Sequence, residues 1–337
     1  MTVSELFYRL SQDPKAAIAA ALAIGVMVVN GMTDAPVAIT GCVSSGAIKQ
    51  RTAVIMAAVC NLLGGVISVC ISPRIAQSVM GSVRLEGALA SAAVFAGLGA
   101  VIVWSLAAYR FGIPTSESHG LLAALGGSAI AVAGRSGIGL EEWKGVLWGL
   151  VLSSLLGFVL GFWSTRLARR LFLKKRTAEA AVRPALVLGG GAMSLMHGAQ
   201  DAQKLMGVMM LCLGGSEDGS VPLWIAVATA LAISLGSLIG GRRIIDNVGR
   251  RMVRPEKCRA LSADLAGAMT LLTLGALGLP VSTTHTHTAA VMGAGASVGR
   301  GGVDLGRVRG MLLAWVLTFP CCGLLGYLGA RLFMLIN

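Results

Sequence analysis

The feature that most constrains this chain is the recurrence of long apolar runs. Each approaches or exceeds the roughly 20 residues that an α-helix needs to cross a bilayer core about 30 Å thick. Hydrophobic residues fill 55% of the 337 positions and charged residues only 13%, more apolar sequence than a soluble core requires. The chain is therefore predicted to be an all-α polytopic membrane protein, with apolar runs at 16–29, 52–72, 88–109, 145–165, 221–241 and 308–336.

The rest of the composition narrows this class. The first apolar run continues into a polar motif without a convincing cleavage site, so we expect a retained helix. The seven cysteines show no paired spacing and lie mostly in apolar runs, so neither disulfides nor cysteine metal ligands are expected. The net charge of +13 gathers in a few loops, which indicates membrane orientation rather than nucleic-acid binding.

Two polar motifs each occur twice, at nearly the same offset along the chain. NGMTDAPVAITG (30–41) aligns with HGAQDAQKLMG (197–207), and GIPTSESHGLLAALGG (112–127) aligns with GLPVSTTHTHTAAVMGAG (278–295). The two offsets are 167 and 166 residues, close to half the chain. Two matches in the same order at one offset predict an internal duplication.

Equivalent loops of the two halves carry opposite charge. The loop at 242–259 holds seven Lys and Arg residues, whereas its repeat mate near 75–92 holds one arginine beside a glutamate. The connection IKQRT (48–52) is basic, and its mate SEDGS (216–220) is acidic. Because loops rich in Lys and Arg stay in the cytoplasm, the halves are predicted to have inverted orientations, as in many secondary transporters.

The predicted architecture is two inverted-topology repeats of about five membrane segments each, with broken helices or hairpins at the motifs. The first repeat spans 16–173, a basic cytoplasmic linker spans 174–184, and the second repeat spans 185–336. An odd number of crossings in each half places both termini outside the cytoplasm, and the loop at 242–259 inside it. The expected location is the plasma or inner membrane. Whether the segments carrying the second motif pair cross or re-enter stays open.

The histidines indicate where a site lies. Ionisable side chains at membrane depth are costly, so they usually face a cavity and mark a functional path. All four histidines of the chain fall inside the repeated motifs and none elsewhere. Four residues of these motifs are expected to line the path: His119, His197, His285 and Gln203.

The first motif pair predicts a site for a coupling cation. Gly31 and Pro36 are expected to interrupt the first helix and to free backbone carbonyls beside Asp34. A carboxylate with hydroxyl, amide and carbonyl oxygens suits Na⁺, whereas a carboxylate alone could carry a proton. A structural alternative is an aspartate that caps a broken helix or pairs with Lys204. The candidate cation residues are Asp34, Asp201, Thr33, Gln200, Asn30 and Glu117.

The second motif pair predicts a site for an oxyanion. Pro followed by Ser or Thr signals a helix start, where hydroxyls and free N–H groups bind anions. Two such starts from inverted halves would meet near the midplane and surround a tetrahedral oxyanion. The alternative is that the hydroxyls only let helices pack closely. The candidate ligands are Ser116, Ser118, Ser282, Thr283, Thr284 and Lys204. Glu117, whose mate is Thr283, either titrates a proton here or reaches interfacial water.

Other chemistries fit these residues less well. His285 and His287 are two apart on a helix and point in different directions, so no metal other than Na⁺ is expected. No Gly-x-Ser-x-Gly motif is present and the polar residues are duplicated, so neither an enzyme nor a cofactor is predicted. Asn61 is interpreted as a polar contact between helices, and Asp264 as part of a helix N-terminus.

At these motifs the chain resembles the inorganic phosphate transporters of the PiT family. The resemblance rests on HGAQDAQKLMG and PVSTTHTHT and extends over roughly residues 20–336. It implies secondary transport of inorganic phosphate coupled to Na⁺ or H⁺, an inverted-repeat fold and often a homodimer in the lipid bilayer. The family's motif residues correspond to Asp34, Asp201, Lys204, Ser116, Ser282, Thr283 and Thr284.

Three departures from the family pattern bear on the function. Thr33 and Gln200 stand where the family has Asn residues that help build the cation site, and Glu117 adds a carboxylate beside the anion. These changes favour proton coupling or an altered substrate. The family also includes sulfate permeases, but an added acceptor favours hydrogenphosphate, which can donate a hydrogen bond. The sequence therefore predicts a symporter for inorganic phosphate, with a sulfate permease, a passive anion channel and a non-transporting scaffold as alternatives.

Overall fold

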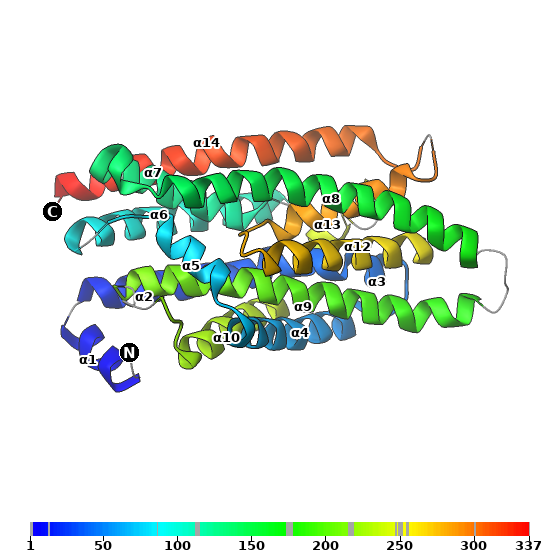
Figure 1. The fold of residues 1–337 in the computed structure, drawn as a ribbon, viewed down its shortest axis with the longest axis horizontal. Coiled ribbons are helices and arrows are strands. Elements are labelled where there is room, and N and C mark those ends of the chain that lie inside the picture. The colour runs from blue at the N-terminus through cyan, green and yellow to red at the C-terminus, as the bar shows by residue number, and fades with distance from the viewer. Residues whose placement is uncertain are drawn as a thin grey trace.

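The structure is a computed structural model whose helices run along the long axis of the molecule (Figure 1). Apart from two isolated bridges, Val83 with Ile138 and Val253 with Val303, no β-structure occurs in the part of the chain it describes. The described residues are 3–12, 14–85, 87–111, 115–172, 178–214, 219–246, 248, 252–253, 256–299 and 301–336.

Each half of the chain supplies five principal helical segments. After the short α1 (Val3–Gln12), the first half contains α2 (Pro14–Thr33) continued by η1 (Ala35–Ile39) and α3 (Thr40–Ser44), then α4 (Gln50–Ile71), α5 (Arg74–Gly81), α6 (Gly87–Phe111), α7 (Glu117–Ala133), η2 (Gly134–Gly137) and α8 (Leu140–Phe172). The second half contains α9 (Ala178–Cys212), α10 (Leu223–Ile239), the short α11 (Arg242–Ile245), α12 (Lys257–Ala276), α13 (Thr283–Ala296) and α14 (Leu305–Ile336). By the repeat offset, α2, α4, α6, α7 and α8 correspond to α9, α10, α12, α13 and α14, as the duplication predicts.

The two halves are interleaved. Helix α7 of the first half packs along α14 of the second, and α13 of the second half packs along α8 of the first. The same exchange joins α2 to α10 and α9 to α4. These contacts are close because glycines allow backbones to touch: a Cβ added at Gly127 would lie 2.0 Å from the Gly323 carbonyl oxygen. The centre of the molecule is therefore built by both halves together.

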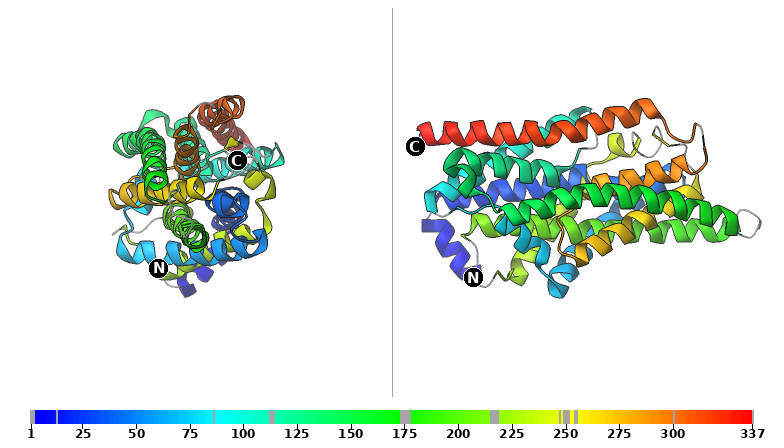
Figure 2. Two further views of the ribbon diagram at one scale, coloured as in Figure 1. Left: turned by 90° about the vertical axis from the view of Figure 1, so that its right-hand side faces the viewer. Right: turned by 45° about the horizontal axis from the view of Figure 1, so that its top comes forward.

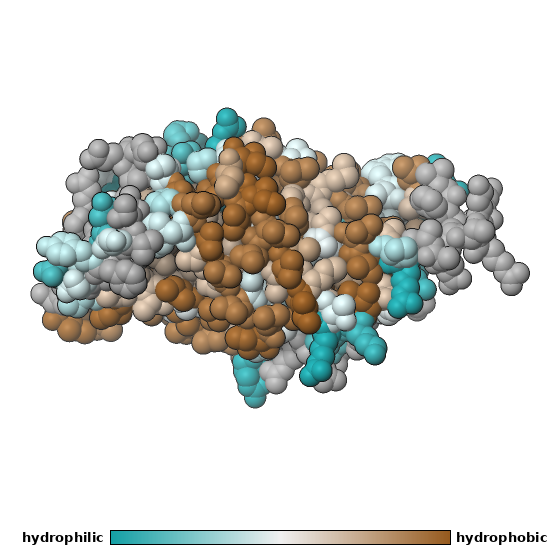
Figure 3. Space-filling model, turned by 90° about the horizontal axis from the view of Figure 1, so that it is seen from below, coloured by the Kyte–Doolittle hydropathy of each residue, from teal (hydrophilic) through white to brown (hydrophobic). Residues whose placement is uncertain are grey.

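The outside of the helical bundle is apolar, whereas polar and charged side chains are buried inside it among apolar ones. On α4, Ile55, Val59, Leu63, Ile67 and Ile71 follow one another at intervals of four and are all exposed. Figure 3 shows a broad hydrophobic band across the middle of one face, with hydrophilic residues towards the ends and margins. Among the described residues, five helical segments are long and apolar enough to cross a bilayer. This inside-out polarity confirms the prediction of a membrane protein.

The ends of the chain lie on one side of the molecule. Both termini are at one end of the long axis, and the facing ends of α8 and α9 are at the other (Figures 1 and 2). Part of the predicted linker, 178–184, forms the first turns of α9, and 174–177 lies outside the described residues. Arg183 Nε donates to the carbonyl oxygen of Ala47 at 2.8 Å, so the α3–α4 connection lies at the linker end as well.

The two aspartate motifs fold differently. Helix α2 ends at Thr33, and the 3₁₀ turn η1 begins at Ala35 with Pro36 in its first turn, so the chain breaks at Asp34 as predicted. Helix α9 instead runs unbroken through Asp201, because the repeat mate of Pro36 is Gln203. Gly31 does not interrupt α2, contrary to the expectation. Its role is close packing, because a Cβ there would lie 1.9 Å from the carbonyl oxygen of Ile233.

Helices α7 and α13 begin inside the molecule. They contain 17 and 14 residues, so at 1.5 Å per residue they span about 26 Å and 21 Å. Both lengths are shorter than the roughly 30 Å of a bilayer core. The two helices start at buried residues, Ser116 and Ser282, and run towards opposite ends of the long axis.

A glycine contact between the halves should be measurable as stability. Gly293→Ala places a Cβ 2.0 Å from the Phe158 carbonyl oxygen, so we expect a loss of about 1–3 kcal/mol and a lower melting temperature in detergent. Gly99→Ala is the control, because its Cβ would meet nothing within 4 Å. It should be neutral or stabilise α6 by up to about 1 kcal/mol. Equal melting temperatures for the two variants would contradict this packing.

Candidate functional site

The two Ser/Thr motifs bring two helix starts together at the centre of the molecule. Ser116 Oγ accepts the N–H of His119 at 3.2 Å, and Ser282 Oγ accepts the N–H of His285 at 3.0 Å. Both serines are thus N-caps, and their hydroxyl protons stay available to a ligand. The imidazole ring centroids of His119 and His285 lie 4.8 Å apart. The predicted meeting of the two motifs is therefore observed.

Asp201 is the centre of the hydrogen-bond network. Its Oδ1 accepts from Lys204 Nζ and, at 3.3 Å, from Ser118 Oγ. Its Oδ2 accepts from Asn30 Nδ2 at 3.2 Å and from Thr283 Oγ1 at 3.1 Å. These partners come from α2, α7, α9 and α13, and all are buried. One carboxylate therefore joins both motif pairs and both halves of the chain.

Lys204 is the buried cation of this network. It is 2% exposed, and its three ammonium donors have three acceptors: Asp201 Oδ1, Ser118 Oγ at 2.6 Å and the Val281 carbonyl oxygen at 2.7 Å. The ammonium thus neutralises Asp201 directly at Oδ1. The equivalent position in the first half is Val37, so this arrangement belongs to the second half alone.

A polar chain behind Asp201 orients His197. The Nε2 of His197 lies 3.2 Å from Asp201 Oδ2, and its Nδ1 lies 3.0 Å from Asn61 Oδ1. Asn61 Nδ2 in turn donates to Ser237 Oγ at 3.1 Å. Asn61 makes the predicted contact between helices and also fixes the imidazole of His197. That second role has no signal in the sequence, because the three residues lie on separate helices.

Asp34 and Glu117 form a second carboxylate group next to Asp201. Thr33 Oγ1 donates to Glu117 Oε1 at 3.1 Å, and both carboxylates are 3% exposed. Glu117, Asp201 and Lys204 all lie within electrostatic range of Asp34. Among the described residues, Asp34 Oδ2 and Glu117 Oε2 make no hydrogen bond of normal geometry, although the Thr284 hydroxyl lies beside Asp34. This group can therefore accept protons or a small cation.

A small cavity lies between the two carboxylate groups. It is lined by Asn30, Glu117, Ser118, Asp201 and Lys204 together with apolar side chains. Its volume is about 10 Å³, roughly the room needed by one water molecule. The site is closed tightly around a space smaller than a tetrahedral oxyanion.

Several predicted residues have contacts away from this cavity. The ring of His285 stacks on Trp315 with centroids 3.9 Å apart, and His119 packs against Phe319 at 5.3 Å, so both imidazoles face α14. Gln200 Nε2 donates to the Leu271 carbonyl oxygen of α12 at 3.2 Å. Gln200 and Gln203 line a groove between α4, α9 and α12. The amide of Gln200 therefore does not reach Asp201.

A buried contact between an aspartate and a histidine was missed from the sequence. His287 Nε2 lies 2.8 Å from Asp264 Oδ1, and both side chains are fully buried. Asp264 does not belong to a helix N-terminus, because α12 begins at Lys257 and carries Asp264 two turns further on. The rings of His285 and His287 point in different directions, as their spacing predicts. The partner of His287 comes from another helix, α12.

Inverted repeats that enclose a closed, charged centre define a membrane transporter. Two regions of the chain, 30–184 and 174–326, match the model of the phosphate transporter family, one in each half. The chain therefore belongs to the phosphate transporter family.

Individual relatives agree with this assignment. A Bacillus subtilis protein named "Probable low-affinity inorganic phosphate transporter" is 34% identical over 304 residues, covering 88% of this chain and 91% of that protein. A Rhizobium meliloti protein of the same name is 32% identical over 309 residues, covering 89% and 90%. The solved structure titled "The sodium-dependent phosphate transporter" aligns with a TM-score of 0.88 over 96% of this chain and 100% of that chain. Its sequence identity is 19%, so this last comparison establishes the shared fold.

The buried pair of Lys204 and Asp201 should be essential for stability. Lys204→Met leaves the Asp201 charge buried without its cation, and such a loss typically costs about 3–5 kcal/mol. Adding Asp201→Asn should restore part of the melting temperature, because the uncompensated charge is removed. The control is Lys144→Met, an exposed lysine paired with Glu141 at 2.6 Å, which should change stability by at most about 1 kcal/mol. Additive losses in the double variant would contradict the pairing.

Proposed function

We propose that this protein is a symporter that imports inorganic phosphate together with protons. The observation that carries the proposal is the charge of the closed centre. Three buried carboxylates, Asp34, Glu117 and Asp201, stand against a single buried ammonium, Lys204. Buried charges must be paired or neutralised, so an anion can enter this centre only together with cations. Coupling follows from that requirement.

The anion would bind between the starts of α7 and α13. The first-turn N–H groups of both helices and the positive ends of their dipoles favour an oxyanion there. The hydroxyls of Ser116, Ser118, Ser282, Thr283 and Thr284 supply further donors, and Lys204 supplies positive charge. A carboxylate acceptor such as Glu117 suits hydrogenphosphate, which donates a hydrogen bond, better than sulfate, which does not.

Protons are the coupling cation that this chemistry favours. The ammonium of Lys204 already neutralises Asp201, which leaves Asp34 and Glu117 to take up the coupling charge. A close pair of buried carboxylates binds a proton readily, because both cannot be ionised together at low cost. Gln200, which would have to help ligate Na⁺, is bonded to α12 instead.

Sodium is the second candidate for the coupling ion. The structural neighbour described above is titled sodium-dependent, and its fold is that of this chain. Free oxygens of Asn30, Asp34 and Glu117 could ligate Na⁺ if the helix starts moved apart. In either case the water-sized cavity must open on alternate sides for phosphate to pass, which inverted repeats accomplish by moving against each other. Assembly into a homodimer and the cytoplasmic location of the linker stay predictions.

The proposal is tested by uptake of radiolabelled phosphate into proteoliposomes under an imposed pH gradient or Na⁺ gradient. We expect accumulation above equilibrium that follows the pH gradient and resists excess sulfate. Accumulation that follows only the Na⁺ gradient would replace the proton by sodium. Sulfate accumulation without phosphate uptake would identify a sulfate permease, and equilibration without accumulation would identify a passive channel.

Glu117 should be required for the response to the pH gradient. Glu117→Gln removes a carboxylate that can carry a proton while keeping its size and the hydrogen bond to Thr33. We expect phosphate accumulation to fall to the equilibrium level. Glu141→Gln is the matched control, because that glutamate is exposed and pairs only with Lys144 in the described structure. Unchanged accumulation in Glu117→Gln would remove Glu117 from the coupling mechanism.

A further inference from the structure

The Asp264–His287 pair lies one turn beyond the central site. His287 follows Thr283 by four residues on α13, a rise of about 6 Å, in the direction of the linker end. Asp264 reaches it from α12, with 2.8 Å between Nε2 and Oδ1. Asp264 Oδ2 and His287 Nδ1 are also buried, and neither has a hydrogen-bond partner among the described residues. Two buried titratable atoms without a partner need an explanation.

The repeat shows that the fold does not require this pair. At the offset of 166, the equivalents of Asp264 and His287 are Leu98 and Leu121. Both leucines are buried in one apolar core cluster, to which both halves of the chain contribute, at 0% and 2% exposure. An apolar contact therefore fills the same place in the same fold. Because a buried ion pair usually stabilises no more than the apolar contact that could replace it, the pair is retained for another reason.

A cleft connects this region to the linker end. Its lining includes Gly41 of α3, Ala260 and Ala263 of α12, and Val291 and Ala294 of α13. Gly41 also touches the Asp264 carboxylate, because a Cβ there would lie 2.8 Å from Oδ2. The interior of the cleft has a volume of about 30 Å³, compared with about 10 Å³ for the central cavity. Asp264 thus lies directly behind the wall of the cleft.

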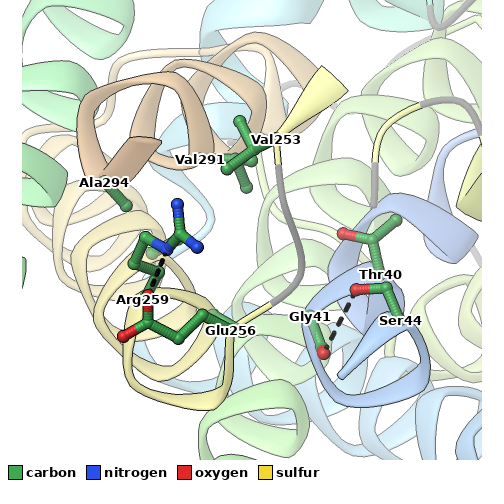
Figure 4. Close-up of a pocket in the computed structure, with 10 residues that line it drawn as sticks. Thr40, Gly41, Ser44, Val253, Glu256, Arg259, Val291 and Ala294 are labelled. Atoms are coloured by element: carbon green, nitrogen blue, oxygen red, sulfur yellow. Dashed lines mark hydrogen bonds and ion pairs between the residues drawn. The ribbon is translucent and has the colours of Figure 1, made fainter. Parts of the chain in front are cut away.

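An arginine and a glutamate form an ion pair at the mouth of the cleft. Arg259 Nε lies 2.8 Å from Glu256 Oε2, and the guanidinium projects from α12 towards α13 and Val253 (Figure 4). Glu256 is partly exposed, so water reaches this mouth. Along the axis, the order is Thr283 in the central site, then His287 with Asp264, then the cleft. Polar and charged groups therefore occur at successive positions between the central site and the linker end.

We propose that Asp264 and His287 form a proton-binding site through which the coupling proton leaves the central site for the linker-side cleft. This inference rests on the proton symport proposed above. A proton fits the pair better than a metal, since no group of three or more His, Cys, Asp or Glu that could hold a metal ion occurs among the described residues. The ionisable group that faces the pair from a neighbouring element is Cys42 on α3, which interacts with Asp264. Further towards the linker end, Arg259 on α12, Glu256 just before α12 and Arg169 near the end of α8 lie around Cys258.

The transfer requires no redox chemistry. The pair holds one proton between His287 Nε2 and Asp264 Oδ1. A second proton from the carboxylates of the central site binds at Asp264 Oδ2 or His287 Nδ1, and one proton then passes to water in the cleft. The pair is left as it began. Phosphate does not contact the pair, so phosphate binding and proton exit are separable functions.

The test compares two measurements on the whole protein in proteoliposomes. The first is exchange of labelled for unlabelled phosphate at equal pH on both sides, which needs only the central site. The second is phosphate accumulation under a pH gradient, with a trapped pH dye recording the protons that enter. The variants are Asp264→Asn and the double variant Asp264→Leu with His287→Leu, which copies the apolar pair of the first half. Glu141→Gln is again the control.

In both variants we expect accumulation and proton entry to be lost while exchange persists. For each coupled proton the lost accumulation is about tenfold per pH unit of gradient. Unchanged accumulation in the variants, with an unchanged number of protons per phosphate, would overturn the inference. A parallel loss of exchange and accumulation in a folded double variant would overturn it as well. Wild-type protein driven by Na⁺ and not by pH would overturn both this inference and proton symport. Wild-type protein driven by pH with unaffected variants would overturn this inference alone.

Discussion

The structure depends on the interaction of Asp201 with Lys204 inside a bilayer-spanning bundle. Burying either charge alone at this depth would cost a prohibitive free energy. As a pair they are neutralised, and Lys204 also donates hydrogen bonds to Ser118 and to the Val281 carbonyl oxygen. Since Asp201 also accepts bonds from Asn30 and Thr283, a single ion pair fixes α2, α7, α9 and α13 relative to one another. The apolar outer surface makes the bundle insert, and this pair gives its centre a defined geometry.

Much of the fold could be predicted because its signals are local or repeated. Apolar runs give the helices, the two motif pairs give the duplication, and Pro36 gives the break at Asp34. Ser116 and Ser282 signal helix starts through N-cap chemistry that needs only neighbouring residues. Gly31 was misjudged for the opposite reason. A glycine is required at this position because the Ile233 carbonyl of another helix packs against it, and the sequence of α2 alone does not reveal that contact.

The position of the site could be predicted from the sequence, but the hydrogen-bond partners within it could not. The motif residues do converge, yet their partners depend on helix rotation. Gln200 is adjacent to Asp201 in the chain and still turns to α12, while Asn61 reaches His197 from α4. The pairing of Asp264 with His287 joins positions 23 residues apart on different helices. Such contacts follow from how the two halves interleave, and no single segment encodes that.

The unequal aspartate motifs give the two halves different mechanical roles. Helix α9 is a continuous rod of 35 residues that carries Asp201 and Lys204. Its counterpart is interrupted at Asp34 by a 3₁₀ turn, where fewer backbone bonds resist bending. In the proposed transport cycle, the second half would stay rigid and the first half would bend at this turn. Asp34 lies at that turn, so the proposed proton binding and the bending of the chain would occur at the same residue.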